Sequence, residues 1–381
     1  MQFLSTGSRA SACARIGAAA GGCASTLKRG GGVVLGESIM DVAEAGLGRL
    51  RDRAASSDAH AAVESAVHER LRPMTARVTG RTGVGKSAVL AVVGSVSLDA
   101  DGLDVRWHEG RTDSSEGEVL VHVIAGAVSP VDIALLGSRP KDVLDGTVVV
   151  LTKADTLDDP AAAAAAASEQ LGRTVLPVMG TTAAGLRGVG RAGAPLDMAD
   201  VRAVASADLR PTDLMTVERF RAADIAVSTR RRDALIECIE LRGLALLVDV
   251  LRQRPAVSDA DAARMLADAT GADALIAAVS TAVSAAAAAR DAELHRTVQQ
   301  ISAGHRRVRD AVEAYLASDE AVAAEMRYAA LRLGVPIETG SEQVALEQAV
   351  LWKRRAAAAG DPDVRRAALA LCRGHVRMLR R

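Results

Sequence analysis

The sequence has few cysteines, no excess of charge of either sign and no long apolar run. Its four cysteines, Cys13, Cys23, Cys238 and Cys372, are far apart and lack metal-site spacing, which fits a reducing cytoplasm. Basic and acidic residues balance at 47 each, so the overall charge does not indicate a nucleic-acid partner. Because no apolar run approaches the roughly 18–20 residues that span a bilayer, we expect a cytoplasmic protein.

Lysine is also scarce, because only five of the 47 basic residues are lysines: Lys28, Lys86, Lys141, Lys153 and Lys353. Two of these, Lys86 and Lys153, lie inside the two motifs described below. The compact ammonium group of lysine fits among phosphate oxygens, and its extended side chain can lie flat over a purine. A planar guanidinium fits neither position equally well. The surviving lysines therefore indicate positions where arginine cannot serve.

The length of 381 residues suggests two domains, preceded by a short extension. Residues 1–35 have almost no apolar periodicity, and we interpret them as a disordered extension or as the result of a start codon placed too early. Residues 36–73 contain two stretches with helical spacing, Ser38–Ala55 and Asp58–Leu71, and they predict a helical pair.

Between residues 74 and 205, short β-branched runs alternate with helical segments, which predicts an α/β domain. Its sheet should be mostly parallel, with helices on both faces. The expected strands are Thr75–Thr79, Leu103–Trp107, Val119–Ile124, Thr147–Leu151 and Val175–Val178.

Residues 206–381 carry helical spacing throughout and predict an all-α C-terminal domain. The expected helices are Thr212–Arg221, Arg230–Arg254, Asp259–Ala269, Ala272–Ser302, His305–Leu333, Ser341–Ala359 and Pro362–Arg380.

A glycine-rich segment after the first expected strand matches the pattern G-x-x-x-x-G-K-S. In such a P-loop the backbone N–H groups and the start of the next helix hold phosphate oxygens. Lys86 should bridge the β- and γ-phosphates, and the Ser87 hydroxyl should ligate Mg²⁺. The predicted phosphate-binding residues are Gly80, Thr82, Gly83, Val84, Gly85, Lys86 and Ser87.

A second motif, Thr152-Lys153-Ala154-Asp155, follows the strand Thr147–Leu151. The Asp155 carboxylate can accept both adjacent donors of guanine, the ring N–H and the exocyclic amine, whereas adenine would leave this acid unpaired. Lys153 should lie along the base, and main-chain N–H groups at Gly180 and Thr181 should back it. These residues predict specificity for GTP or GDP.

Two elements of an efficient GTP-hydrolysing site are missing. No threonine occurs between Ser87 and Trp107, where a switch threonine would be expected. In place of D-x-x-G stands Trp107-His108-Glu109-Gly110. Either His108 or Glu109 replaces the lost group or neither does. We favour the second interpretation, because polar loop residues are usually only solvated, and the catalytic residues stay unknown.

With these motifs the chain resembles the translation-factor-like and dynamin-like P-loop GTPases, and most of all actinobacterial dynamin-like GTPases with a helical C-terminal half. The resemblance is carried by Gly80–Ser87, Thr152–Asp155, Thr174–Gly180 and Leu241–Ala245. It implies a GTP-binding hydrolase with Mg²⁺ at Ser87. It also implies homo-oligomers, or pairing of GTPase copies through the helical domain.

The altered switch elements leave three functions open. The chain could be a slow GTPase that couples nucleotide state to its helical domain, a non-hydrolysing GTP-binding scaffold, or a P-loop ATPase or kinase. Basic groups at Arg230–Arg232, Lys353–Arg355 and Arg373–Arg381 could bring it to an anionic membrane surface, although such runs are more often solvated helix faces.

Overall fold

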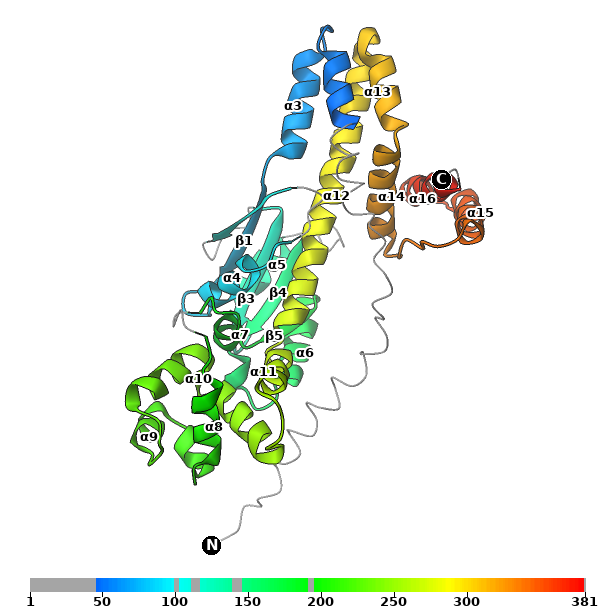
Figure 1. Ribbon diagram of the computed structural model, residues 1–381. Coiled ribbons are helices and arrows are strands. Elements are labelled where there is room, and N and C mark those ends of the chain that lie inside the picture. The colour runs from blue at the N-terminus through cyan, green and yellow to red at the C-terminus, as the bar shows by residue number, and fades with distance from the viewer. Residues whose placement is uncertain (1–45, 99–102, 111–116, 139–145, 191–194, 380–381) are drawn as a thin grey trace.

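A computed structural model of the chain describes residues 46–98, 103–110, 117–138, 146–190 and 195–379 (Figure 1). The extension expected over residues 1–35 lies outside the described residues. The centre of the structure is a five-stranded sheet in the order β2-β1-β3-β4-β5, in which every neighbouring pair is parallel. The strands are β1 (Met74–Gly80), β2 (Val105–Glu109), β3 (Val119–Ala125), β4 (Thr147–Thr152) and β5 (Val175–Val178).

Helices cover both faces of this sheet, as the alternating sequence predicts. One face packs against α4 (Lys86–Gly94) and α12 (Ala272–Gly304), with α7 (Gly180–Leu186) beside α4. The other face packs against α5 (Pro130–Gly137) and α6 (Pro160–Leu171). Because helices cover β3 and β4 on both sides, the side chains of both strands are buried almost without a break, which explains their β-branched runs.

The strand order places a topological switch beside β1, because β2 lies on one side of it and β3 on the other. In open parallel sheets the crevice at the carboxyl ends of the strands at such a switch is the usual ligand site. The segment that leaves β1 at this point is the glycine-rich one.

A first helical cluster follows the sheet. It consists of α8 (Met198–Ser206), α9 (Val217–Ala222), α10 (Thr229–Gln253) and α11 (Asp259–Ala269). Their shared core centres on the fully buried side chains of Phe220, Ile239, Leu244 and Leu247. Helix α10 contacts α7, so this cluster adjoins the sheet at the carboxyl end of β5.

A second group of helices forms a bundle at the other end of the molecule. It joins helical residues 46–54, α3 (His60–Leu71), the distal half of α12 and α13 (Arg309–Leu316). Helix α14 (Asp319–Leu333) continues it and carries a hairpin of α15 (Glu342–Ala358) and α16 (Pro362–Met378). The single helix expected over His305–Leu333 is wrong, because α13 ends at Leu316 and Ser318 then caps α14 by accepting a hydrogen bond from Ala321 N.

Helix α12 spans 33 residues and connects the two ends of the molecule. Figure 1 shows it running along the sheet and on into the bundle beside α3 and α13. Its alanine run, Ala285–Ala288, is buried, because only small side chains allow so close an approach. By length and composition α12 could cross a membrane, contrary to the expectation that no apolar run is long enough, but half of its apolar window is buried inside the protein.

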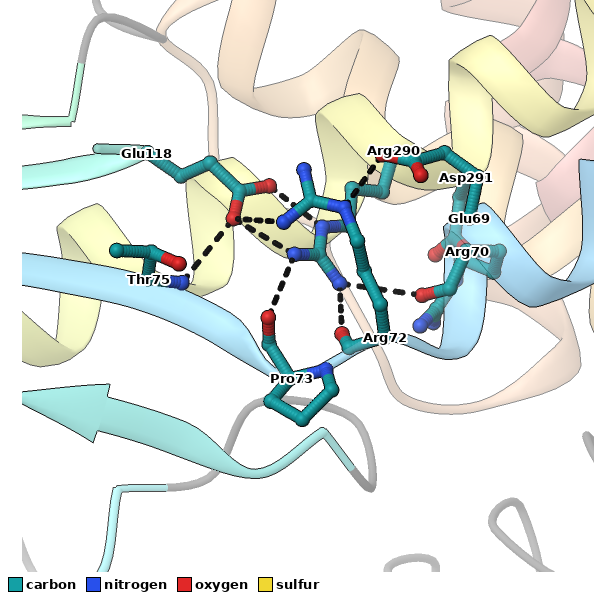
Figure 2. Close-up of polar contacts among 8 residues, drawn as sticks. All are labelled: Glu69, Arg70, Arg72, Pro73, Thr75, Glu118, Arg290 and Asp291. Atoms are coloured by element: carbon teal, nitrogen blue, oxygen red, sulfur yellow. Dashed lines mark hydrogen bonds and ion pairs between the residues drawn. The ribbon is translucent and has the colours of Figure 1, made fainter. Parts of the chain in front are cut away.

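A buried ionic joint ties α12 to the start of β1 and β3 (Figure 2). Arg290 of α12 donates to both oxygens of Glu118, at 2.5 and 2.6 Å. It also donates to the carbonyls of Arg70 and Arg72, at the end of α3, and of Pro73. Thr75 N of β1 donates to Glu118 as well, at 3.2 Å. One guanidinium therefore holds helix α3, strand β1 and the start of β3 together.

Candidate functional site

The glycine-rich loop leaves β1 at the carboxyl end of the sheet and enters α4 at Lys86. Gly80, Gly83 and Gly85 all have positive φ, at 139°, 79° and 95°. At Gly80 a β-carbon would lie 2.3 Å from the carbonyl oxygen of Val123, so no larger residue fits there. The loop conformation is thus one that only this glycine pattern adopts without strain.

Lys86 and Ser87 stand at the first turn of α4. Lys86 Nζ donates to the carbonyls of Gly80 and Arg81, at 3.0 and 3.1 Å. These carbonyls hold the ammonium over the loop, where an anion could reach it. Lys86 is largely buried, with 12% of its side chain exposed.

Glu109, at the end of β2, faces this pair. Ser87 Oγ donates to Glu109 Oε2 at 3.4 Å, and Lys86 Nζ lies 3.7 Å from Glu109 Oε1. The register of β2 beside β1 brings the carboxylate here. Whether Glu109 or His108 replaces the lost group therefore stays a prediction, and the structure adds only that the Glu109 carboxylate lies beside Ser87 and Lys86.

Thr152 joins the second motif to the first. Its hydroxyl donates to the carbonyl of Val84 in the glycine-rich loop and lies 3.0 Å from the carbonyl of Ile124. Gly85 packs against the same side chain, because a β-carbon there would lie 3.6 Å from Thr152 Oγ1. Thr152 is one of the predicted nucleotide-binding residues, and in the structure its buried side chain joins the two loops.

Lys153 and Asp155 directly follow the carboxyl end of β4. Lys153 is exposed and has a left-handed backbone, with φ 55°, and Asp155 is half-buried in the short helix η1 (Ala154–Thr156) that follows. Gly180 and Thr181 begin α7 nearby, where Gly180 packs closely on Ala88 of α4. The structure thus places the predicted residues of both motifs along one edge of the sheet.

Glu240 is a residue of this edge that the sequence analysis missed. Burial, and then repulsion by Asp155, raise the pKa of its carboxyl, although a hydrogen bond from Thr181 and the charge of Lys153 oppose this. Its backbone, with φ 56° and ψ 169°, interrupts α10. The apolar periodicity of α10 runs straight through this position, so no sequence signal could have found it.

A buried polar chain supports the glycine-rich loop from the other face of the sheet. His122 Nε2 pairs with Asp132 Oδ1 at 2.9 Å, and Thr79 Oγ1 lies 3.2 Å from His122 Nδ1. Burial lowers the pKa of His122. Burial also disfavours the charged form of Asp132, but hydrogen bonds from Ser129 and His122 outweigh this effect, so the pKa of Asp132 is lowered. All three side chains are fully buried. This Thr79–His122–Asp132 network is inaccessible to a substrate, and it holds strands β1 and β3 together.

Other cavities lie away from this edge. One of about 770 Å³ lies between α3 and α12, and one of about 660 Å³ lies between α12, α14 and α16. Neither is lined by residues of the two motifs. We favour the sheet edge as the candidate site, because its lysine, serine and carboxylates converge at the topological switch point. The arginines that line the cavity between α12, α14 and α16 are instead mostly paired with neighbouring acidic residues.

The described ranges contain no group of three His, Cys, Asp or Glu side chains that could hold a metal ion. A Mg²⁺ ion usually takes few protein ligands and completes its shell with phosphate oxygens and water. The Ser87 hydroxyl beside Glu109 fits that requirement. Comparison with known proteins finds no matching family model, no matching curated protein and no matching solved structure.

Proposed function

We propose that the protein binds a guanine nucleotide with Mg²⁺ at the carboxyl edge of its sheet and acts as a slow GTPase. The observation that carries the proposal is the Thr152 brace. It joins the Thr152–Asp155 motif directly to the backbone of the glycine-rich loop. Two motifs that are 65 residues or more apart in sequence therefore form one continuous surface, as a single nucleotide would require.

The phosphate end of the proposed site is the glycine-rich loop. Lys86 would exchange its bonds to the loop carbonyls for phosphate oxygens, a change that keeps the ammonium paired. Ser87 would ligate Mg²⁺, and Glu109 would hold water of its hydration shell. The pairing of Glu109 with Lys86 and Ser87 supports this assignment.

The base end is the surface formed by Lys153, Asp155, Gly180 and Thr181. The proximity of Asp155 to Thr181 through Glu240 supports their assignment to one pocket. An ionised Asp155 would accept the two neighbouring donors of guanine, so GTP should be preferred to ATP. An ATPase or kinase therefore becomes the less favoured function.

Slow turnover follows from the missing switch residues. Phosphoryl transfer depends on positioning water and neutralising developing charge. Trp107 stands where an aspartate would be expected, and the segment between Ser87 and Trp107 supplies no threonine. This same observation keeps a non-hydrolysing GTP-binding scaffold as the second candidate, which measurement of phosphate release separates from the first.

The helical parts of the protein would change position with the state of the bound nucleotide. Helix α12 begins beside the base end, where Met179 N donates to the carbonyl of Thr270 at 2.9 Å. Gly271 has φ 73°, and a β-carbon there would lie 2.2 Å from the carbonyl oxygen of Pro177. A shift of the β5–α7 loop would therefore move the start of α12, whose other end lies in the bundle.

Direct competition between GTP and ATP, measured by calorimetry in Mg²⁺, tests the proposal. We expect the wild type to prefer GTP, and Asp155→Asn to lose GTP affinity and gain affinity for xanthosine triphosphate, because an amide complements the ring carbonyl of xanthine. Asp158→Asn is the matched control, since this aspartate is exposed in the same loop. Preference of the wild type for ATP, or the absence of binding to any triphosphate, would overturn the proposal.

A further inference from the structure

Glu240 has a backbone conformation that side chains other than glycine rarely adopt. With φ 56° and ψ 169° it lies in a region of high strain. In the described residues only one other non-glycine residue has positive φ, and that residue is Lys153. Both strained positions therefore lie at the base end of the proposed nucleotide site.

The neighbouring helices hold this conformation in place. The kink frees the carbonyl of Ile239, which accepts a hydrogen bond from Thr182 Oγ1 at 2.9 Å. Gly185 of α7 approaches the carbonyl of Cys238 so closely that a β-carbon would lie 1.8 Å from it. Gly243 packs on Thr182 in the same way. Helix α10 is thus bent at Glu240, where it packs against α7, and it also contacts the short helix η1.

The Glu240 carboxyl lies beside Asp155, because α10 contacts the short helix η1 that holds this aspartate. Burial and the charge of Asp155 raise the pKa of Glu240, and the hydrogen bond from Thr181 together with the charge of Lys153 offsets this only in part. Two neighbouring carboxyl groups of this kind are stabilised by a ligand that presents several N–H donors together. The Watson–Crick edge of guanine presents three: the ring N–H and two hydrogens on the exocyclic amine.

We propose that Glu240 is a specificity-determining residue of the nucleotide site, which accepts the second amine hydrogen of guanine while Asp155 accepts the first and the ring N–H. This inference rests on the proposed function, because it assigns a further contact within the same site. It also makes α10 a direct contact of the base, so the first helical cluster senses whether the site is filled.

Inosine triphosphate separates this role from a purely structural one, because it differs from GTP by lacking the exocyclic amine. We expect Glu240→Gly to lower GTP affinity by roughly 10-fold, the usual worth of a hydrogen bond to a charged group. The affinity for inosine triphosphate should stay unchanged. Glycine suits the backbone at this position, so the variant removes the carboxylate without opposing the bend in α10.

Calorimetric titration of the full chain with each magnesium nucleotide gives the measurement. Glu240→Gln keeps an acceptor oxygen but loses the charge. Its affinity for GTP should therefore fall less than that of Glu240→Gly, and its affinity for inosine triphosphate should not change. Glu237→Gln, at an exposed position one turn earlier in α10, serves as the control. A helix that merely needs Glu240 for its shape would lose affinity for both nucleotides equally.

The outcomes separate the two proposals. If the wild type binds GTP in an Asp155-dependent way but both Glu240 variants keep its full preference for GTP over inosine triphosphate, the role of Glu240 is refuted and the proposed function stands. If the wild type binds neither nucleotide, both proposals fail.

Discussion

At the scale of single residues, the arrangement of the candidate site depends on where the strands end. Glu109 reaches Ser87 because β2 pairs with β1 in a register that brings Val78 opposite Glu109. The backbone N–H of Gly110 then donates to the carbonyl of Val78 at 2.9 Å, which fixes the end of β2. One residue of slip along the strand would turn His108 towards the loop instead.

Glu109→Gln should weaken the effect of Mg²⁺ on GTP binding. In the proposed site the carboxylate orients water around the ion, and an amide loses the charge that makes this favourable. We expect the gain in GTP affinity on adding Mg²⁺ to fall roughly 3–10-fold, with affinity in chelator unchanged or higher because Lys86 is freed. Titrations with and without Mg²⁺ measure it, and His108→Gln is the matched control. An equal gain in variant and wild type would contradict the role of Glu109.

At the scale of elements, α12 is held to the sheet by one buried ion pair rather than by apolar contacts alone. Arg290 has 8% of its side chain exposed, and Glu118 has 24%. Burial disfavours the Glu118 carboxylate, but hydrogen bonds from Arg290 and Thr75 outweigh it and lower its pKa. The pair joins α12 to the residue that precedes β3 (Figure 2).

Glu118→Gln should lower the free energy of unfolding by about 2–4 kcal/mol, because it leaves the Arg290 charge buried without its counter-ion. Since the folded-state pKa of Glu118 is lowered, the loss should be complete above the carboxyl's ordinary pKa and disappear as pH falls through the folded-state value. Urea unfolding at several pH values measures this.

Glu69→Gln provides the control for this experiment. Glu69 pairs with Arg72 in the same region but is 64% exposed, and exposed pairs contribute little. We expect a change below about 1 kcal/mol for this variant. An equal decrease in the free energy of unfolding for the two variants would show that the Arg290–Glu118 pair contributes no more to stability than an exposed ion pair.

At the scale of the whole molecule, two helical assemblies are linked to the proposed site. The first cluster touches its base end through α10, and the bundle is connected to it through α12 (Figure 1). A nucleotide-dependent change would therefore reach both, because α7 packs against α10 and the β5–α7 loop bonds to the start of α12.

A dilute sample of the purified protein should bind GTP but hydrolyse it near the background rate. The proposed site supplies phosphate charge through Lys86 but no residue that positions water. We expect phosphate release to rise steeply with protein concentration if a second copy completes the site. Lys86→Ala is the control, since it should abolish both binding and any residual release.

Turnover on the order of 10 per second from dilute protein, in the range of efficient phosphoryl-transfer enzymes, would show that this chain contains a complete catalytic site. A rate that stays at background at every concentration would instead favour the non-hydrolysing scaffold.

The sequence by itself determined the local elements and their order. Runs of β-branched residues specify strands that are buried on both faces, and β5 and α6 begin and end where the pattern predicts. The glycine and lysine of G-x-x-x-x-G-K-S likewise specify the loop, because its positive φ angles are a local property of glycine.

Only the tertiary structure decided which distant residues meet. The brace from Thr152 to Val84, the pairing of Glu109 with Ser87, the Arg290 joint and the strained Glu240 all depend on strand register and helix packing. Periodicity reports which face of an element is buried, but it does not report which element covers that face. The bend at Glu240 is the clearest case, because contacts from α7, far away in sequence, impose it on residues whose local preference is helix.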